Sequence, residues 1–285
     1  MKLKRAARQT SGQKRTFRRR MIQVMSMLVY NADVKNWYTG TISQSDLKNV
    51  CVPGLNCYSC PGAVASCPIG SIQNTIANGR FPFFITGFLM IIGALFGRMI
   101  CSYACPVGLI QELLYKIPVK KFRKTKKSRA VTRKLSLLKY AVLIILVIAL
   151  PLSLYFKDGA GSPVFCSWVC PAGTVSAGIP LVILNESLRS AIGFLFDWKI
   201  ILAGILIILS TFMFRPFCRF VCPLGAIYSF FNKSAVFGIK IDEKKCTHCG
   251  ACAAVCKMDT LLVNDRECIR CGDCLESCHF KALHF

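Results

Sequence analysis

Histidine and acidic side chains are scarce in this 285-residue chain, and each shortage argues against a class of function. Only three histidines occur, and all lie in the C-terminal tail: His248, His279 and His284. A haem held between membrane helices usually has histidine ligands there, so the sequence predicts no haem. Of thirteen acidic residues, seven fall in the last 44 positions, which leaves the rest of the chain apolar or basic.

Motifs for nucleotides and nucleic acids are missing as well. The chain has neither a Walker A loop nor a GxGxxG turn that opens a helix. Its net charge of +24 comes without a nucleic-acid-binding motif or a basic groove interleaved with aromatics, so no nucleic-acid partner is expected. A mean hydropathy of +0.48 and a 54% share of hydrophobic residues instead favour insertion into a membrane.

Three apolar stretches without charged side chains are long enough, or nearly so, to cross a bilayer core that needs about 20 helical residues. They are Phe81–Gly97, Tyr140–Phe156 and Ile200–Phe214. A fourth candidate, Met21–Ala32, is shorter and is followed by Asp33 and Lys35. The stretch Ile179–Phe196 carries polar residues in its middle and is predicted to be an interfacial or re-entrant helix.

Two basic blocks predict the topology. Residues 1–20 contain nine Lys or Arg and residues 116–139 contain eleven, with no acid in either block. The positive-inside rule places both blocks in the cytoplasm, which requires an even number of crossings between them and makes Met21–Ala32 the first crossing. We therefore expect a mainly α-helical, multi-pass protein of a bacterial or archaeal cytoplasmic membrane. It should have about four transmembrane helices in two similar halves and cytoplasmic N- and C-termini.

Eight of the eighteen cysteines form two matched runs in the tail, each with the spacing Cys-x2-Cys-x2-Cys-x3-Cys. This spacing is typical of bacterial ferredoxins with two [4Fe-4S] clusters, in which the fourth cysteine of each run binds the other cluster. A structural zinc site more often has two separated CxxC pairs, so zinc is the weaker alternative. The predicted ligand sets are Cys246, Cys249, Cys252 and Cys278, and Cys268, Cys271, Cys274 and Cys256.

A second motif, CxxxCPxG, occurs three times before the tail. Its two thiols lie one helical turn apart, and the proline suits the first turn of a new helix. Two thiolates cannot close a cubane, so the motifs should pair across the fold. The predicted topology brings one pair of motifs to the cytoplasmic face, where a further cluster is expected. The ligands of this inner site would be Cys101, Cys105, Cys218 and Cys222.

The third copy, Cys166 and Cys170, should lie at the outer face near four more cysteines: Cys51, Cys57, Cys60 and Cys67. By analogy with the inner site, the favoured outer set is Cys60, Cys67, Cys166 and Cys170. Alternatives remain open at this stage. Cys57 and Cys60 could supply the ligands, or Cys51 and Cys57 could form a disulfide, because the outer side can be oxidising. The CxxxCP cysteines could also be buried structural residues.

With these motifs, the chain resembles the ferredoxin-type membrane proteins related to NapH, MauN and the membrane part of NosR. It also resembles 4Fe-4S binding membrane proteins of anaerobic bacteria that carry a segment similar to Cys51–Gly62. The resemblance implies four transmembrane helices, a cytoplasmic ferredoxin module, and electron transfer between the quinone pool and another redox protein. The Cys51–Cys67 extension departs from the simpler NapH pattern, and a fused flavin-binding domain of the NosR kind is missing.

The sequence thus predicts three regions. They are a basic N-terminus (residues 1–20), a transmembrane domain (21–235) and an α+β ferredoxin domain with two clusters (236–285). The predicted function is electron transfer between a donor, cytoplasmic or in the quinone pool, and a partner redox protein such as a ferredoxin, a flavoprotein or a reductase subunit. One rival is a quinol dehydrogenase subunit that binds quinone near the aromatic run Tyr228–Phe231, which could otherwise be an interfacial aromatic belt. Another rival is a CcoG-like assembly or metal-reduction factor.

Overall fold

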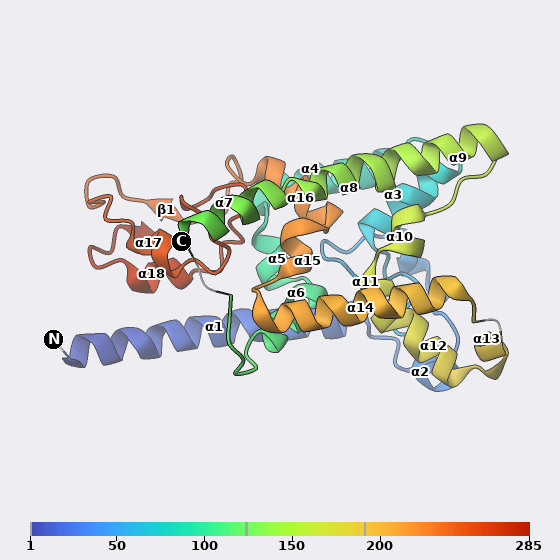
Figure 1. The fold of residues 1–285 in the computed structure, drawn as a ribbon, viewed down its shortest axis with the longest axis horizontal. Coiled ribbons are helices and arrows are strands. Elements are labelled where there is room, and N and C mark those ends of the chain that lie inside the picture. The colour runs from blue at the N-terminus through green and yellow to red at the C-terminus, as the bar shows by residue number, and fades with distance from the viewer. Residues whose placement is uncertain (1, 123–124, 191) are drawn as a thin grey trace.

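The computed structural model describes residues 2–122, 125–190 and 192–285, and these residues are mainly helical (Figure 1). Three predicted segments are incompletely described, because residue 1 of the first basic block, residues 123 and 124 of the second and residue 191 of the stretch Ile179–Phe196 lie outside these ranges. The first half contains α1 (Lys2–Tyr30), α2 (Lys35–Thr39), η1 (Asp46–Asn49), α3 (Pro68–Ala77), α4 (Phe83–Phe96), α5 (Met99–Tyr103) and α6 (Pro106–Leu114).

The second half is also helical, and a small two-stranded module follows it. Its helices are α7 (Lys126–Leu135), α8 (Leu138–Val142), η2 (Leu143–Ala149), α9 (Leu150–Asp158), α10 (Val164–Trp168), α11 (Pro171–Gly173), η3 (Thr174–Gly178), α12 (Ile179–Leu184), α13 (Glu186–Ser190), α14 (Phe194–Phe212), α15 (Pro216–Phe220) and α16 (Pro223–Phe231). The tail contains β1 (Lys240–Ile241), α17 (Ala251–Val255), α18 (Asp273–Ser277) and β2 (Leu283–His284).

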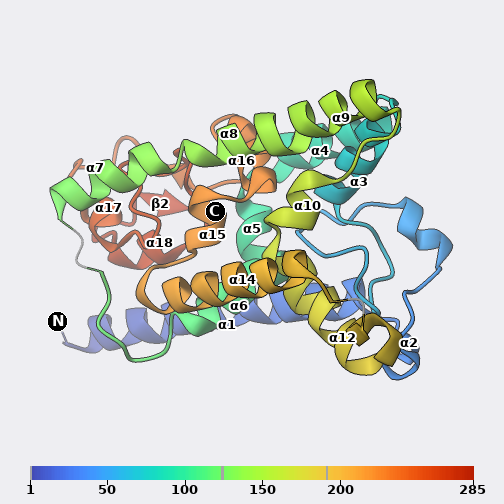
Figure 2. The ribbon, with the colours of Figure 1, turned by 45° about the vertical axis from the view of Figure 1, so that its right-hand side comes forward.

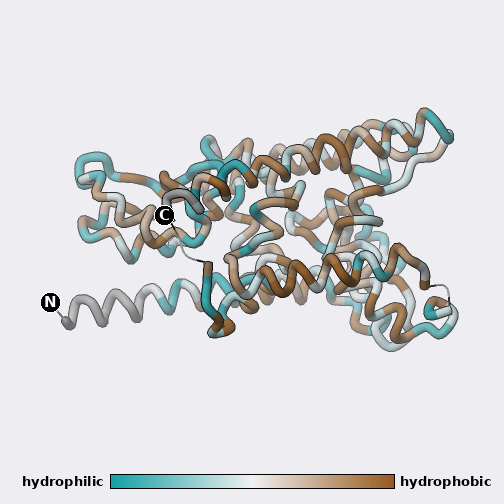
Figure 3. The backbone as a smooth tube through the Cα atoms, in the orientation of Figure 1, coloured by the Kyte–Doolittle hydropathy of each residue, from teal (hydrophilic) through white to brown (hydrophobic). Residues whose placement is uncertain are grey.

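Among the residues that the structure describes, two helices are long and apolar enough to cross a membrane. Ser128–Asp158 is continuous through α7, α8, η2 and α9, and its 31 residues extend about 46 Å. Helix α14 has 19 residues and extends about 28 Å, close to the thickness of a bilayer core. Figure 3 shows both as predominantly hydrophobic. Their windows of highest hydropathy are only 22% and 11% buried, so most of their apolar side chains face outward.

The other two predicted spans form a shorter helix in one case and part of a longer, basic helix in the other. The stretch Phe81–Gly97 forms the 14-residue helix α4, because Pro82 begins it and Gly97, at a φ of 52°, ends it. A Cβ on Gly97 would lie 2.8 Å from Oδ1 of Asn232, so the turn requires glycine. Residues 21–30 of the predicted span Met21–Ala32 form the last part of α1. The basic N-terminus forms the first part of the same helix, which has 29 residues.

The molecule is elongated, and both chain termini lie near the same end (Figures 1 and 2). The tail module sits at that end, where α18 contacts α1 and where β1 pairs antiparallel with β2. The opposite end contains α2, α12 and α13, so the predicted interfacial stretch is divided into short helices there. Between the two ends, the short helices α5, α6, α15 and α16 are enclosed by α1, α14 and the long α7–α9 rod.

Candidate functional site

Each CxxxCP motif forms the same helix–turn–helix unit. The first cysteine lies in a five-residue helix, as Cys101 does in α5 and Cys218 does in α15. The second cysteine is the N-cap of the next helix, as Cys105 is for α6 and Cys222 is for α16, with backbone angles in the extended region. Proline follows as the first helical residue, where its missing N–H costs no hydrogen bond. All four thiols are buried.

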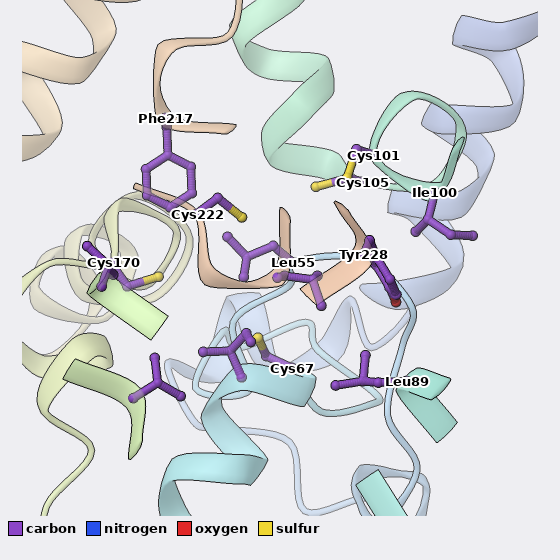
Figure 4. Close-up of a cluster of buried hydrophobic side chains, with 14 of the residues drawn as sticks. Leu55, Cys67, Leu89, Ile100, Cys101, Cys105, Cys170, Phe217, Cys222 and Tyr228 are labelled. Atoms are coloured by element: carbon purple, nitrogen blue, oxygen red, sulfur yellow. The ribbon is translucent and has the colours of Figure 1, made fainter. Parts of the chain in front are cut away.

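These four inner cysteines converge on one place in the core. In Figure 4 the sulfur of Cys222 points toward those of Cys101 and Cys105. Burial raises the pKa of the Cys222 thiol well above its usual value, and the neighbouring Cys218, Cys101 and Cys105 raise it further. The three cysteines that the predicted topology groups with Cys222 are therefore its neighbours in the structure. The four side chains fit the donor set of an iron–sulfur cubane.

Two fully buried arginines connect the motifs reciprocally. Arg98 donates from Nη2 to the carbonyl oxygen of Cys218 at 3.0 Å, and Arg215 donates from Nη1 to the carbonyl oxygen of Cys101. Each arginine precedes the first cysteine of its own motif by three residues, so the two units hold each other in the same way. Arg215 has a left-handed backbone (φ 51°), which is uncommon for a residue with a side chain.

Each buried arginine has a carboxylate partner. Glu112 accepts from Arg215 at 3.0 Å and from Arg19 at 2.9 Å. Burial alone would raise the pKa of Glu112, but these arginines hold it below its usual value. Sequence reasoning did not single out these residues. The sequence does contain one signal for the arginines, because Arg98 and Arg215 each stand three positions before the first cysteine of a CxxxCP motif.

The outer cysteines form a second site of the same design. Cys67 is the N-cap of α3 and Cys170 that of α11, each followed by proline, and Cys166 lies in α10. A cavity of about 280 Å³ is lined by four cysteines: Cys57, Cys67, Cys166 and Cys170.

The four outer thiols also affect one another. Burial raises the pKa of the Cys166 thiol, and Cys170, Cys67 and Cys57 raise it further. For Cys57, burial and then Cys170 raise the pKa to about 11. The fourth cysteine at the cavity is thus Cys57, whereas the analogy with the inner site favoured Cys60. A turn separates the two residues, since the backbone N–H of Cys60 donates to the carbonyl of Cys57.

The two remaining cysteines of the extension lie beside the outer site and do not line its cavity. Cys60 is 1% exposed and Cys51 is 5% exposed. The backbone of Cys51 forms an isolated parallel β-bridge with Ser66. All eighteen cysteines of the chain fall within the described ranges, and none of them is in a disulfide. Cys51 and Cys57 are thus not linked to each other in this structure.

In the tail, one predicted ligand set surrounds a single cavity. Its lining includes Cys256, Cys268, Cys271 and Cys274, the four residues that the crossed spacing assigns to one cluster, together with Cys252 of the other set. Burial raises the pKa of Cys271 to about 12. The ligand set Cys246, Cys249, Cys252 and Cys278 stays a prediction from the spacing. Within the described residues, no group of three or more His, Cys, Asp or Glu side chains is placed to hold a single metal ion.

Hydrogen bonds join the tail module to the inner site. Ser102, next to Cys101, donates from Oγ to the carbonyl of Ile269 at 2.8 Å, and Asn232 donates to the carbonyl of Cys268 at 2.8 Å. Glu267 pairs with Arg98 at 2.6 Å and with Lys139. These contacts hold the second run of tail cysteines against the inner motifs.

The extension joins the inner site to the outer one. Burial and the neighbouring Cys218 and Cys101 raise the pKa of the Cys105 thiol to about 12. A Cβ on Gly54 would lie 3.2 Å from Cα of Cys105, so the extension packs closely against the inner motif. Leu55 is 2% exposed and lies between the labelled cysteines of both sites in Figure 4. It also lines the outer cavity.

Tyr228 is part of this core, although its aromatic run was considered as a quinone contact or as an interfacial belt. The side chain is fully buried, and its hydroxyl donates to the carbonyl of Pro53 at 2.8 Å. Tyr228 therefore holds the extension in place and is not at a surface. Phe231, three residues on, lines a separate apolar cavity between α3, α4, η2 and α16.

Comparison with known proteins agrees with this pattern of motifs. A family profile described as a 4Fe-4S binding domain matches residues 78–125, 138–182 and 195–242, so each match contains one CxxxCP motif. A second profile with that description matches residues 239–262 in the tail. No solved structure matches the chain.

Named relatives come from archaea and bacteria. An uncharacterized protein of Methanocaldococcus jannaschii, MJ0750, is 33% identical over 225 residues, which cover 68% of this chain and 84% of the relative. The methylamine utilization ferredoxin-type protein MauN of Methylorubrum extorquens is 26% identical over 59% of this chain and 50% of its own length. The ferredoxin-type protein NapH of Escherichia coli is 23% identical over 66% of this chain and 59% of its own length.

Proposed function

Because the chain belongs to the family of ferredoxin-type, 4Fe-4S binding membrane proteins, we propose that it conducts single electrons across a membrane through four cysteine sites in series. The order is the outer site, the inner site, and then the two tail sites. An iron–sulfur cluster bound at each site would take up and release one electron at a time. The protein supplies the spacing, the burial and the hydrogen bonds around each site.

The proposal rests on contacts that the inner site makes with the tail and with the segment that lines the outer site. Toward the tail, one hydrogen bond from Ser102 reaches Ile269, which adjoins Cys268. Toward the outer face, Gly54 packs against the backbone of Cys105, and the next residue, Leu55, lines the outer cavity with Cys57, which follows Leu55 by two residues. Two residues of extended chain span at most about 7 Å. The inner site is therefore joined to the tail by a hydrogen bond and to the outer site by packing of the extension.

The membrane placement is part of the proposal. We assign the four crossings to the end of α1 from Met21 onward, to α4, to the part of the α7–α9 rod from Tyr140 to Phe156, and to α14, with the tail module in the cytoplasm. The assignment is supported by the common end at which both termini lie and by the basic blocks at residues 1–20 and 116–139. A bilayer core about 30 Å thick separates the two faces, so a conduit needs sites at more than one depth.

The partner at the cytoplasmic end would be another redox protein, such as a ferredoxin, a flavoprotein or a reductase subunit. Our test is to count iron on anaerobically purified protein. We expect about sixteen irons per chain for four cubanes. About eight irons, retained after Cys222→Ser and Cys170→Ser substitution alike, would restrict the clusters to the tail and refute the conduit.

A second candidate function is quinol oxidation by the same chain, and an apolar cavity favours it. Ile72, Leu89, Leu143 and Phe231 line this cavity, and Arg80 adds a polar group. Purified protein should then show reduction of its clusters by a short-chain quinol, and Leu89→Trp, which fills the cavity, should abolish that reduction. Equal rates in the wild type and this variant would remove the cavity as a quinol site.

A further inference from the structure

Two glutamines occupy the same place in the two CxxxCP sites. Gln73 follows Cys67 by six residues, and Gln111 follows Cys105 by six residues, so each lies in the helix that its cysteine caps. Both are buried, at 0% and 5% exposure. A buried primary amide has two donors and an oxygen acceptor to satisfy, so its partners define its role.

Each glutamine makes the same three hydrogen bonds. At the inner site, Nε2 of Gln111 donates to the sulfur of Cys218 at 3.2 Å and to the carbonyl of Val107 at 3.2 Å, while Oε1 accepts from the backbone N–H of Phe217 at 3.1 Å. The sulfur is thus that of the first cysteine in the opposite motif.

The outer site repeats the arrangement. Nε2 of Gln73 donates to the sulfur of Cys166 at 3.2 Å and to the carbonyl of Ile69 at 3.4 Å, while Oε1 accepts from the backbone N–H of Phe165 at 2.9 Å. Phe165 and Phe217 each precede the first cysteine of their motif.

The orientation of each amide follows from its partners. A backbone N–H can only donate, so the group facing Phe165 or Phe217 must be the amide oxygen. The nitrogen of each amide then faces the sulfur and the helix carbonyl, both of which are acceptors. An N–H bond to a thiolate is charge-assisted and stabilises added negative charge on that ligand.

We infer that Gln73 and Gln111 are a matched pair of positioning residues that set the reduction potentials of the outer and inner sites. The inference rests on the proposed function, since it requires a cluster at each site. Reduction adds negative charge to a cluster and its thiolates, so a donor aimed at a ligand sulfur stabilises the reduced form and raises the potential. The shared geometry makes the two effects similar in size.

The test replaces each glutamine with leucine in the full-length protein, followed by redox titration with electron paramagnetic resonance. Losing one charge-assisted hydrogen bond should change the ratio of oxidised to reduced cluster about tenfold at a fixed applied potential, a downward shift of about 59 mV. Gln111→Leu should shift the inner transition alone, and Gln73→Leu the outer one alone. The transitions are identified as those missing in Cys222→Ser and Cys170→Ser.

Each variant is the control for the other, since a general loosening of the fold would move both transitions. If Gln111→Leu does not retain its iron, Gln111→Met provides a second side chain of similar length without a donor. Wild-type potentials in variants with a full iron content would overturn this inference and leave the proposed function standing. A wild-type protein with no inner or outer transition would instead refute the proposed function itself.

Discussion

Replacing Cys57 with serine should remove one of the four clusters, whereas the same change at Cys60 should leave all four in place. The two residues lie three positions apart in one loop, and both are free thiols, with Cys60 buried and Cys57 partly buried. They differ in the direction of the side chain, because Cys57 lines the outer cavity with Cys67, Cys166 and Cys170, and Cys60 does not.

The expected magnitude follows from the ligand count. A cubane contains four irons, so Cys57→Ser protein should carry about twelve irons per chain where the wild type carries about sixteen. Cys60→Ser protein should still carry about sixteen. Serine keeps the approximate size of the side chain, so a loss of iron reports the missing sulfur ligand more than altered packing.

The measurement is the iron content of anaerobically purified protein, combined with redox titration of each variant. Cys170→Ser is the matched control, because it removes an accepted member of the same cavity and should produce the same loss of one transition as Cys57→Ser. Loss of irons from Cys60→Ser alone would refute the assignment from the cavity and restore the ligand set that the inner motif suggested. Full iron content in all three variants would show that the outer cysteines hold no cluster.

Three further predictions concern how the sites are held and oriented. Glu267→Gln removes the carboxylate that pairs with buried Arg98 and Lys139, and it should weaken docking of the tail by about 3–5 kcal/mol. Amide hydrogen exchange in the tail should then be faster than in the wild type, and an unchanged exchange rate would contradict the expectation. Glu112→Gln leaves the buried Arg19 and Arg215 without their carboxylate and should lower the free energy of unfolding by a similar amount. A melting temperature equal to that of the wild type would show that these ion pairs do not stabilise the fold. A reporter that is active only outside the cytoplasm should work when fused after Gly159 and fail at the C-terminus, and the reverse pattern would invert the topology.

The local structure of each cysteine motif could be predicted from the sequence, because it depends on residues that are neighbours in the chain. A CxxxCP motif defines a short helix, an extended N-cap and a new helix whatever surrounds it, and the structure contains this unit at Cys101, Cys166 and Cys218. The four cysteines Cys256, Cys268, Cys271 and Cys274, which the spacing assigns to one cluster, line one cavity together with Cys252, and their role as ligands stays a prediction. The mainly helical character also follows from the long apolar stretches.

Contacts between distant segments could not be predicted in this way. Arg98 and Glu267 are 169 residues apart, and Arg215 and Glu112 are 103 apart, so only the folded chain brings their charges together. The choice between Cys57 and Cys60 depends on how the extension turns back over the core. Several contacts decide that turn, including the bond from Tyr228 to Pro53, and none of them is visible in the spacing of cysteines.

The recurrence of sulfur-directed donors also bears on whether the outer cysteines hold a cluster or disulfides. A disulfide sulfur is a weak acceptor, so a buried amide aimed at it would leave its N–H poorly satisfied. A thiolate ligand accepts a strong, charge-assisted bond. At both sites a cation donates as well to the carbonyl of the cysteine concerned, Arg98 to Cys218 at 3.0 Å and Lys199 to Cys166 at 3.2 Å.

The cation and the amide come from different elements at each site, yet they reach equivalent atoms. Arg98 precedes α5, whereas Lys199 lies in α14, so local repetition of the sequence does not explain their shared target. Positive charge and N–H donors around the first cysteine favour a site that gains negative charge. That requirement belongs to a reducible cluster with thiolate ligands and is not shared by a neutral disulfide, which supports the proposal that the outer site is a redox site of the same kind as the inner one.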